Sequence, residues 1–261
     1  MKILFIGDIV GQPGLDAVRT LVPKLIADES IDIVIANAEN TCGGSGLTPR
    51  QYKQLRAAGI DLITMGDHIY KRSEILSVLE SEDRISKPAN FPREAPGRDV
   101  IYAPARDGTM VAAFSLLGRT FMRPVDCPFK AADRLLAEIG IKAQVVVVDM
   151  HAEATADKYL MGHYLKGRVS AVLGTHTHVP TADEQLLGTT AFISDVGMTG
   201  PYDSILGRRI DRVMAHALDF VPTPFDVATG DPRLGGAIVE VDSATGHARS
   251  IRRVMLESRA P

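Results

Sequence analysis

The stretch Ile3-Leu4-Phe5-Ile6-Gly7-Asp8 begins with four apolar residues, which predict a buried strand that Gly7 closes. A second buried strand is expected over residues 31–36, after a helix over residues 14–27. Strand, helix and strand in this order are typical of an α/β protein.

The same alternation continues toward the C-terminus. Thr48 and Pro49 predict the cap and first turn of a helix over residues 51–58, and Ser73 is expected to cap a helix over residues 73–81. Further helices are expected over 131–139 and 152–165, and further strands over 62–65, 101–103, 110–116, 144–149, 170–173, 192–193, 236–241 and 250–255. We therefore expect one domain over residues 1–261, with helices on both sides of a central sheet.

Composition narrows the class of protein. The 261 residues carry a net charge of −3, which gives no sign of the basic surface that binds nucleic acids. No apolar stretch approaches the roughly 20 residues that cross a bilayer, and the apolar run after Lys2 is too short for a signal peptide. Because the two cysteines, Cys42 and Cys127, make no disulfide scaffold, we expect a cytoplasmic protein with no membrane partner.

Polar side chains follow five of the expected strands. We call them the strand-end cluster: Asp8, Glu39, Asn40, Asp67, His68, His151, His176 and His178. Sites in α/β proteins form beyond the carboxyl ends of strands, so these groups are expected to converge on one crevice. Carboxylates, an amide and imidazoles together suit manganese, iron or zinc. Taken singly, Asp8 and Glu39 also fit turn or cap positions, and His151 also fits a core histidine.

Gly174-Thr175-His176-Thr177-His178 is the most specific part of the cluster. We expect an extended backbone here, which would turn both imidazoles to the same side. Two imidazoles on one side are costly to bury without a partner, so the segment predicts metal binding. Neither cysteine has the spacing of a structural zinc site.

Several of these motifs resemble one protein family. They are Gly7-Asp8-Ile9-Val10-Gly11, Asn37-Ala38-Glu39-Asn40, Gly66-Asp67-His68, Pro88-Ala89-Asn90-Phe91-Pro92, Gly118-Arg119-Thr120-Phe121, His151-Ala152-Glu153-Ala154-Thr155, the segment 174–178, and Asp195-Val196-Gly197-Met198-Thr199-Gly200-Pro201-Tyr202. Together they are similar to the calcineurin-like metallophosphoesterases, and more closely to the YmdB-type family of bacterial phosphodiesterases. The similarity runs through nearly the whole chain.

The resemblance implies a four-layer αββα sandwich, two divalent metal ions and a homo-oligomer. Iron or manganese is the expected metal, with zinc as a further option. The resemblance places Asp8, Glu39, Asn40 and His178 at one ion, and Glu39, Asp67, His151 and His176 at the other, with Glu39 bridging. It also implies a phosphodiester substrate such as a 2′,3′-cyclic nucleotide, with His68 beside the scissile bond.

The residue types fit this chemistry. Two divalent ions roughly 3.5–4 Å apart neutralise a phosphodiester, and they lower the pKa of a bridging water so that hydroxide forms near neutral pH. His68 follows an expected ligand directly, so we assign it as the general acid for the leaving oxygen. No Gly-x-Ser-x-Gly motif indicates a serine hydrolase.

The chain departs from the related patterns at two positions. Val10 stands where the wider superfamily has histidine, a loss that the YmdB-type family shares and that Asn40 compensates. Asp67 stands where that family usually has asparagine, so this chain carries an additional negative charge at the second ion.

For several other residues, and for the function itself, the sequence leaves alternatives. Gly43 and Gly44 fit either a loop that approaches substrate phosphate or a flexible turn, and Arg119 and Tyr202 fit either substrate contacts or structural roles. Cys42 is more typical of a thiol that takes no part in function than of a sensor of oxidants. The alternatives to a phosphodiesterase are a phosphomonoesterase or nucleotidase on the same centre, and a regulatory module that binds a nucleotide. RNA is a further candidate ligand of such a module, although the charge does not indicate it.

Overall fold

The first strand, β1 (Lys2–Ile6), lies inside a mixed sheet in the computed structural model, which describes residues 1–258. It pairs in parallel with β2 (Ile33–Asn37) and antiparallel with β12 (Gly230–Val241). The strand order is β11-β12-β1-β2-β3-β4, and β13 pairs with β12. The remaining strands of this sheet are β3 (Leu62–Thr64), β4 (Ile85–Ser86), β11 (Gly200–Asp203) and β13 (Ala248–Glu257).

The other strands form a second sheet in the order β5-β6-β7-β8-β10-β9. Its four inner strands are parallel, and an antiparallel strand closes each edge. The strands are β5 (Ile101–Pro104), β6 (Met110–Leu117), β7 (Val145–His151), β8 (Ala171–Thr175), β9 (Gln185–Leu187) and β10 (Thr190–Ile193). The expectation of one central sheet is therefore wrong.

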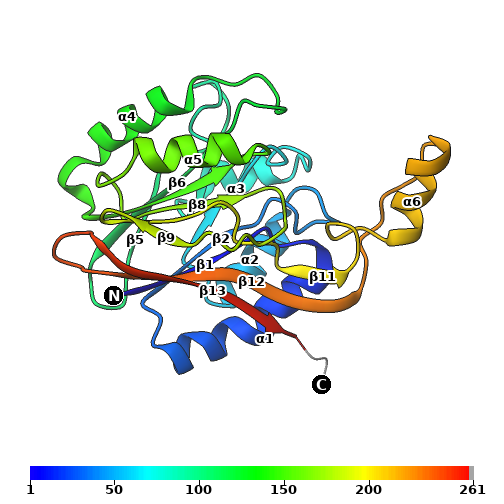
Figure 1. Cartoon of the computed structure of the whole chain (residues 1–261), viewed down its shortest axis with the longest axis horizontal. Helices are drawn as coiled ribbons and strands as arrows, with labels where there is room; N and C mark the ends of the chain where they lie inside the picture. Colours follow the sequence, from blue (N-terminus) through cyan, green and yellow to red (C-terminus); the bar gives the residue numbers. More distant parts are fainter. Residues whose placement is uncertain (259–261) are drawn as a thin grey trace.

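The two sheets pack face to face, and helices cover only the outer face of each (Figure 1). The helices over the first sheet are α1 (Gly11–Glu29), α2 (Pro49–Ala57) and α3 (Ile75–Ser81), and those over the second are α4 (Pro128–Ile139) and α5 (Thr155–Tyr164). A short 3₁₀ turn, η1 (Gly140–Lys142), follows α4. The four-layer αββα sandwich implied by the resemblance is confirmed.

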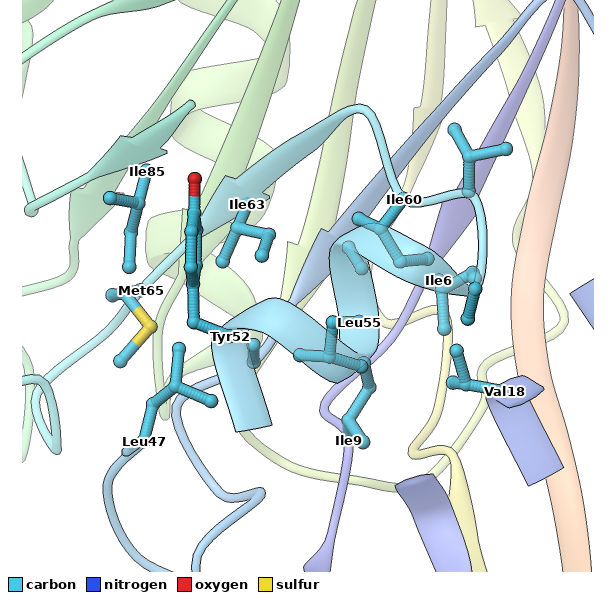
Figure 2. Close-up of a cluster of buried hydrophobic side chains, with 14 of the residues drawn as sticks. Ile6, Ile9, Val18, Leu47, Tyr52, Leu55, Ile60, Ile63, Met65 and Ile85 are labelled. Carbon is cyan, nitrogen blue, oxygen red and sulfur yellow. The ribbon is translucent and has the colours of Figure 1, made fainter. Parts of the chain in front are cut away.

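Both faces of the central strands are apolar because each face meets a different layer. In β1, Ile3 and Phe5 face the second sheet, whereas Leu4 and Ile6 face the helices. Figure 2 shows the helix-facing core of the first sheet, where Tyr52 and Leu55 of α2 lie near Ile63 of β3. The apolar runs in the sequence reflect burial between layers on both sides.

Helix boundaries follow the local capping chemistry. Thr48 caps α2 through a capping box with Gln51, which confirms the predicted start. Ser73 does not cap α3, because Ser73 lies in a turn before the helix and Glu74 takes the cap position. α1 starts at Gly11, three residues before the expected helix, since Pro13 fits its first turn.

A sixth helix, α6 (Ile210–Asp219), was not expected, and it projects away from the sandwich (Figure 1). None of its residues is buried. Among residues 1–258, no helix combines the length and apolar character needed to cross a membrane.

Candidate metal centre

The structure brings the whole strand-end cluster together at one end of the two sheets. Asp8 follows β1, Glu39 and Asn40 follow β2, and the side chains of Asp67 and His68 follow β3. His151 is the last residue of β7, which runs two residues further than expected, and His176 and His178 follow β8. A continuous chain of contacts between 2.7 and 3.8 Å joins these side chains.

One group of ligand atoms is especially close. Glu39, Asp67, His151 and His176 each offer one atom, and these atoms all lie within 4.8 Å of one another. Nε2 of His151 lies 3.1 Å from Oε1 of Glu39 and 3.2 Å from Oδ1 of Asp67. Nδ1 of His176 lies 3.0 Å from the same Nε2. This is the second of the two ligand sets that the resemblance implies.

The residues of this group fit a divalent cation. Oε1 of Glu39 is buried and has no hydrogen-bond partner, so a strong acceptor faces the group without a donor of its own. Gly66 leaves the necessary room, because a Cβ atom there would lie 2.3 Å from Nε2 of His151 and 2.4 Å from Oε2 of Glu39. Carboxylate and imidazole donors are those that manganese, iron and zinc accept.

The electrostatic surroundings of Nε2 of His151 favour a positive charge. Burial alone would lower the pKa of His151, but the carboxylates of Glu39 and Asp67 raise it well above its ordinary value. Burial would raise the pKa of Asp67, yet its contacts with His151 and the neighbouring imidazoles lower it. The carboxylates of this group therefore favour a cation beside Nε2 of His151.

A second group lies around Asp8, which is fully buried. Its Oδ1 is 3.8 Å from Nε2 of His178 and 3.4 Å from Nδ2 of Asn40, and its Oδ2 accepts a hydrogen bond from the backbone N–H of His176. The Asn40 amide is oriented with Nδ2 toward His178 and Oδ1 toward His68. A ligand role for Asn40 would require the opposite orientation, with Oδ1 toward His178, by rotation about the Cβ–Cγ bond.

The far ring nitrogens of two histidines are held in place. Nδ1 of His178 lies 3.1 Å from the carbonyl oxygen of Leu206. Nδ1 of His151 lies 2.8 Å from Oγ1 of Thr175, and Thr175 in turn donates a 2.6 Å hydrogen bond to Asp149. These contacts leave Nε2 of each ring directed at the cluster.

Asp149 is a site residue that sequence reasoning missed. It is fully buried between the sheets, and burial raises its pKa to about 6 even though Asn37, Thr64 and Thr175 all donate to its carboxylate. The pattern that could have revealed it is the spacing of Asp149 and His151, which places both on one side of a strand. A carboxylate in an otherwise apolar strand needs a polar partner.

The segment 176–178 is not extended, so the expectation that His176 and His178 share one side is wrong. Both have positive φ angles, 90° and 65°, which are uncommon for residues other than glycine. His176 therefore turns toward His151, and His178 turns toward Asp8.

A buried ion pair below this segment explains its shape. Asp195 accepts hydrogen bonds from the backbone N–H and the hydroxyl of Thr177, at 3.2 and 2.6 Å. Lys158 of α5 lies 2.8 Å from the same carboxylate, and both charged side chains are almost fully buried. Sequence reasoning could not assign Lys158 a role, because the pair connects residues 37 positions apart.

His68 lies at the open side of the cluster, and its side chain is 28% exposed. Its backbone N–H donates to Oε2 of Glu39, and its Nδ1 lies 2.7 Å from Oδ1 of Asn40. The imidazole is thus fixed beside both ligand groups and reaches solvent.

The remaining candidate residues make contacts outside the two ligand groups. Gly43 and Gly44 have positive φ angles, and their carbonyl oxygens accept from the guanidinium of Arg208, a residue that sequence reasoning missed. Arg119 is exposed, and its backbone N–H donates to Asp157. Tyr202 has its hydroxyl bonded to the Met198 carbonyl and its ring against Arg233, so it supports the loop after β10.

Comparisons with known proteins agree with the motifs. The model of the YmdB-like protein family matches residues 4–254. A Bacillus subtilis protein named 2′,3′-cyclic-nucleotide 2′-phosphodiesterase is 44% identical over 98% of this chain and 97% of its own length.

Two crystal structures share the fold. A hypothetical protein from Thermus thermophilus is 42% identical, with a TM-score of 0.93 over 99% of this chain and 100% of that one. A Mycoplasma pneumoniae protein described as a novel phosphatase is 29% identical, with a TM-score of 0.92 over 98% and 93%. The resemblance found in the motifs is confirmed, and this chain belongs to the YmdB-like family.

Proposed function

We propose that this protein is a metal-dependent phosphodiesterase whose substrates include 2′,3′-cyclic nucleotides. The observation that carries the proposal is the group of Glu39, Asp67, His151 and His176, whose ligand atoms converge within 4.8 Å. The name of the B. subtilis relative supports the substrate class.

We assign the ligands as the two groups divide them. Glu39, Asp67, His151 and His176 would hold one cation, and Asp8, Asn40 and His178 would hold a second, with Glu39 shared. Iron or manganese best suits this mixture of carboxylate, amide and imidazole. When bound, such ions neutralise phosphate charge and lower the pKa of a water molecule.

His68 supplies the proton for the leaving oxygen in this proposal. Its Nδ1 faces the side-chain amide of Asn40, so Nε2 is the ring nitrogen that is free to carry a proton to the substrate. An imidazole suits this task because its ordinary pKa lies near neutral pH.

The net charge of the centre matches a diester better than a monoester. Three carboxylates, those of Asp8, Glu39 and Asp67, face two expected divalent ions, which leaves a net charge of about +1 before the substrate binds. A phosphodiester carries one negative charge and a monoester carries up to two. A bound diester would therefore bring the net charge close to zero, whereas a dianionic monoester would leave one negative charge uncompensated.

The test compares two p-nitrophenyl esters after the protein is stripped with a chelator and reloaded with manganese, iron or cobalt. We expect faster hydrolysis of bis(p-nitrophenyl) phosphate than of p-nitrophenyl phosphate, and hydrolysis of 2′,3′-cyclic AMP. His151→Ala should lose this activity, whereas His247→Ala, at an exposed position away from the centre, should keep it.

A preference for the monoester would favour the nucleotidase alternative. No hydrolysis with any metal, together with tight nucleotide binding, would favour a regulatory module.

We also propose a homo-oligomer in the cytoplasm. The exposed apolar side chains of α6 and the residues after it, including Leu218 and Phe220, support self-association. Both cysteines, Cys42 and Cys127, are free, as is usual in a reducing compartment.

A further inference from the structure

Three polar side chains stand at alternate positions where β7 ends: Asp149 and His151 belong to the strand, and Glu153 follows it. Asp149 acts on His151 through Thr175, as described above. Glu153 reaches a different ring, because its Oε2 lies 3.2 Å from Nε2 of His176. Glu153 belongs to the motif 151–155, and the proposed chemistry gives it no role.

The two nitrogens of His176 face opposite surroundings. Nδ1 lies 3.0 Å from Nε2 of His151 and 3.6 Å from Oδ1 of Asp67, so it faces the ligand group. Nε2 faces Glu153 instead. A neutral imidazole carries one proton, and only the nitrogen without that proton can bind a cation. His176 therefore ligates through Nδ1 only when the proton is on Nε2.

We propose that Glu153 is a positioning residue that holds the proton of His176 on Nε2, so that Nδ1 is free to bind the cation. The proposal rests on the proposed function in that it takes His176 as a ligand.

The position of Glu153 allows its effect on His176 to be tested without disturbing the fold. Its side chain is 50% exposed, whereas Asp149 is fully buried and His178 is held by a backbone carbonyl. Loss of the Glu153 carboxylate opens no cavity in the core. It removes the side-chain acceptor that faces Nε2 of a residue whose φ angle of 90° already lies outside the common regions.

The first test determines which ring nitrogen of His176 carries the proton in the metal-free protein. Long-range ¹H–¹⁵N spectra of histidine-labelled protein distinguish the two neutral forms of each of the 7 histidines, and a His176→Gln variant assigns the signal. We expect the Nε2–H form in the wild type and in Glu153→Gln, whose amide oxygen still accepts. We expect a mixture of the two forms in Glu153→Ala. The same spectrum for Glu153→Ala as for the wild type would overturn the proposal.

The second test measures Mn²⁺ affinity by competition with a chelator. Glu153→Ala should weaken binding at one site by about 10-fold or more, as is usual when the partner of a ligating histidine is removed. Glu153→Gln should stay within a few-fold of the wild type, and Glu80→Ala, at an exposed position of α3, should not change it. A Glu153→Gln variant as weak as Glu153→Ala would show that charge, not proton placement, is what matters, and would overturn the proposal. Failure of the wild type to bind Mn²⁺ would instead refute the proposed function.

Discussion

At the scale of the residue, His68 has a role that depends on the leaving group. Removing its imidazole leaves the ligand atoms of Glu39 and Asp67 in place, so His68→Ala should keep its bound metal. We expect turnover of a 2′,3′-cyclic nucleotide to fall by about 10²- to 10⁴-fold, the usual range for general acid catalysis. The loss should be much smaller for bis(p-nitrophenyl) phosphate, because nitrophenolate leaves without a proton. Equal losses on both substrates, measured at the same metal content, would refute the role.

Asp67 offers a second test at this scale, because asparagine has nearly the same shape without the charge. Asp67→Asn keeps an oxygen near Nε2 of His151 but removes one negative charge from the centre. We expect weaker metal binding, since hard cations favour carboxylate oxygen. At saturating metal we expect faster diester hydrolysis and a smaller preference for diester over monoester. We also expect activity to rise with pH at lower pH values, because less negative charge would lower the pKa of the water that the ions activate.

The comparison needs both forms assayed from acid to alkaline pH with metal in excess. An Asp67→Asn variant that is no faster at any pH, and whose activity rises over the same pH range as that of the wild type, would show that the charge of Asp67 does not govern the reaction.

At the scale of the element, Lys158 and Asp195 connect α5 to the segment that carries His176 and His178. Lys158→Met leaves the carboxylate of Asp195 buried without its counter-charge. Breaking a buried pair in this way costs about 3–5 kcal/mol, so we expect the free energy of unfolding in urea to fall by that amount. The exposed Lys142→Met serves as the control and should change it by less than about 0.5 kcal/mol. A similarly small change for Lys158→Met would mean that Asp195 is satisfied by Thr177 and Gly197 alone.

Helices and strands that are determined by residues close together in the chain could be predicted from the sequence. The Thr48 cap with Pro49 and Gln51 fixes the start of α2, and the apolar run 145–148 fixes β7. The positions of the strand-end cluster were predictable for the same reason, since each follows a strand. The division into two sheets was not, because an apolar strand face looks the same in sequence whether a helix or another sheet covers it.

The shape of the site depended on contacts distant in sequence. The bend at His176 and His178 follows from Asp195 and Lys158, and the closure of the Gly43–Gly44 loop follows from Arg208. Neither contact produces a periodic pattern in the sequence from which it could have been predicted. Glu153 and Asp149 were visible in the sequence, but their roles needed the orientation of the two imidazoles.

At the scale of the whole molecule, α6 projects away from the sandwich, and Phe220 follows it directly. Leu218 and Phe220 are 76% and 82% exposed, and Ile210 and Met214 are also exposed. Apolar side chains gathered in this way mark contact surfaces. We expect the native protein to sediment as an oligomer, and the double variant Leu218→Glu and Phe220→Ser to sediment as a monomer with the same circular dichroism spectrum. An unchanged sedimentation coefficient would place the contact elsewhere.

The pairing of β1 with β12 determines when the centre can be completed during synthesis. The Gly7 N–H donates to the Gly235 carbonyl, and the carbonyl of Asp8 accepts from Thr199. Asp8 is therefore fixed by Thr199 and Gly235, which are translated long after it. At roughly 5–20 residues per second, a ribosome needs on the order of tens of seconds to deliver them. A nascent chain thus holds Asp8 unplaced until Gly235 has been made, and the hydrolase becomes competent only after β12 has left the ribosome.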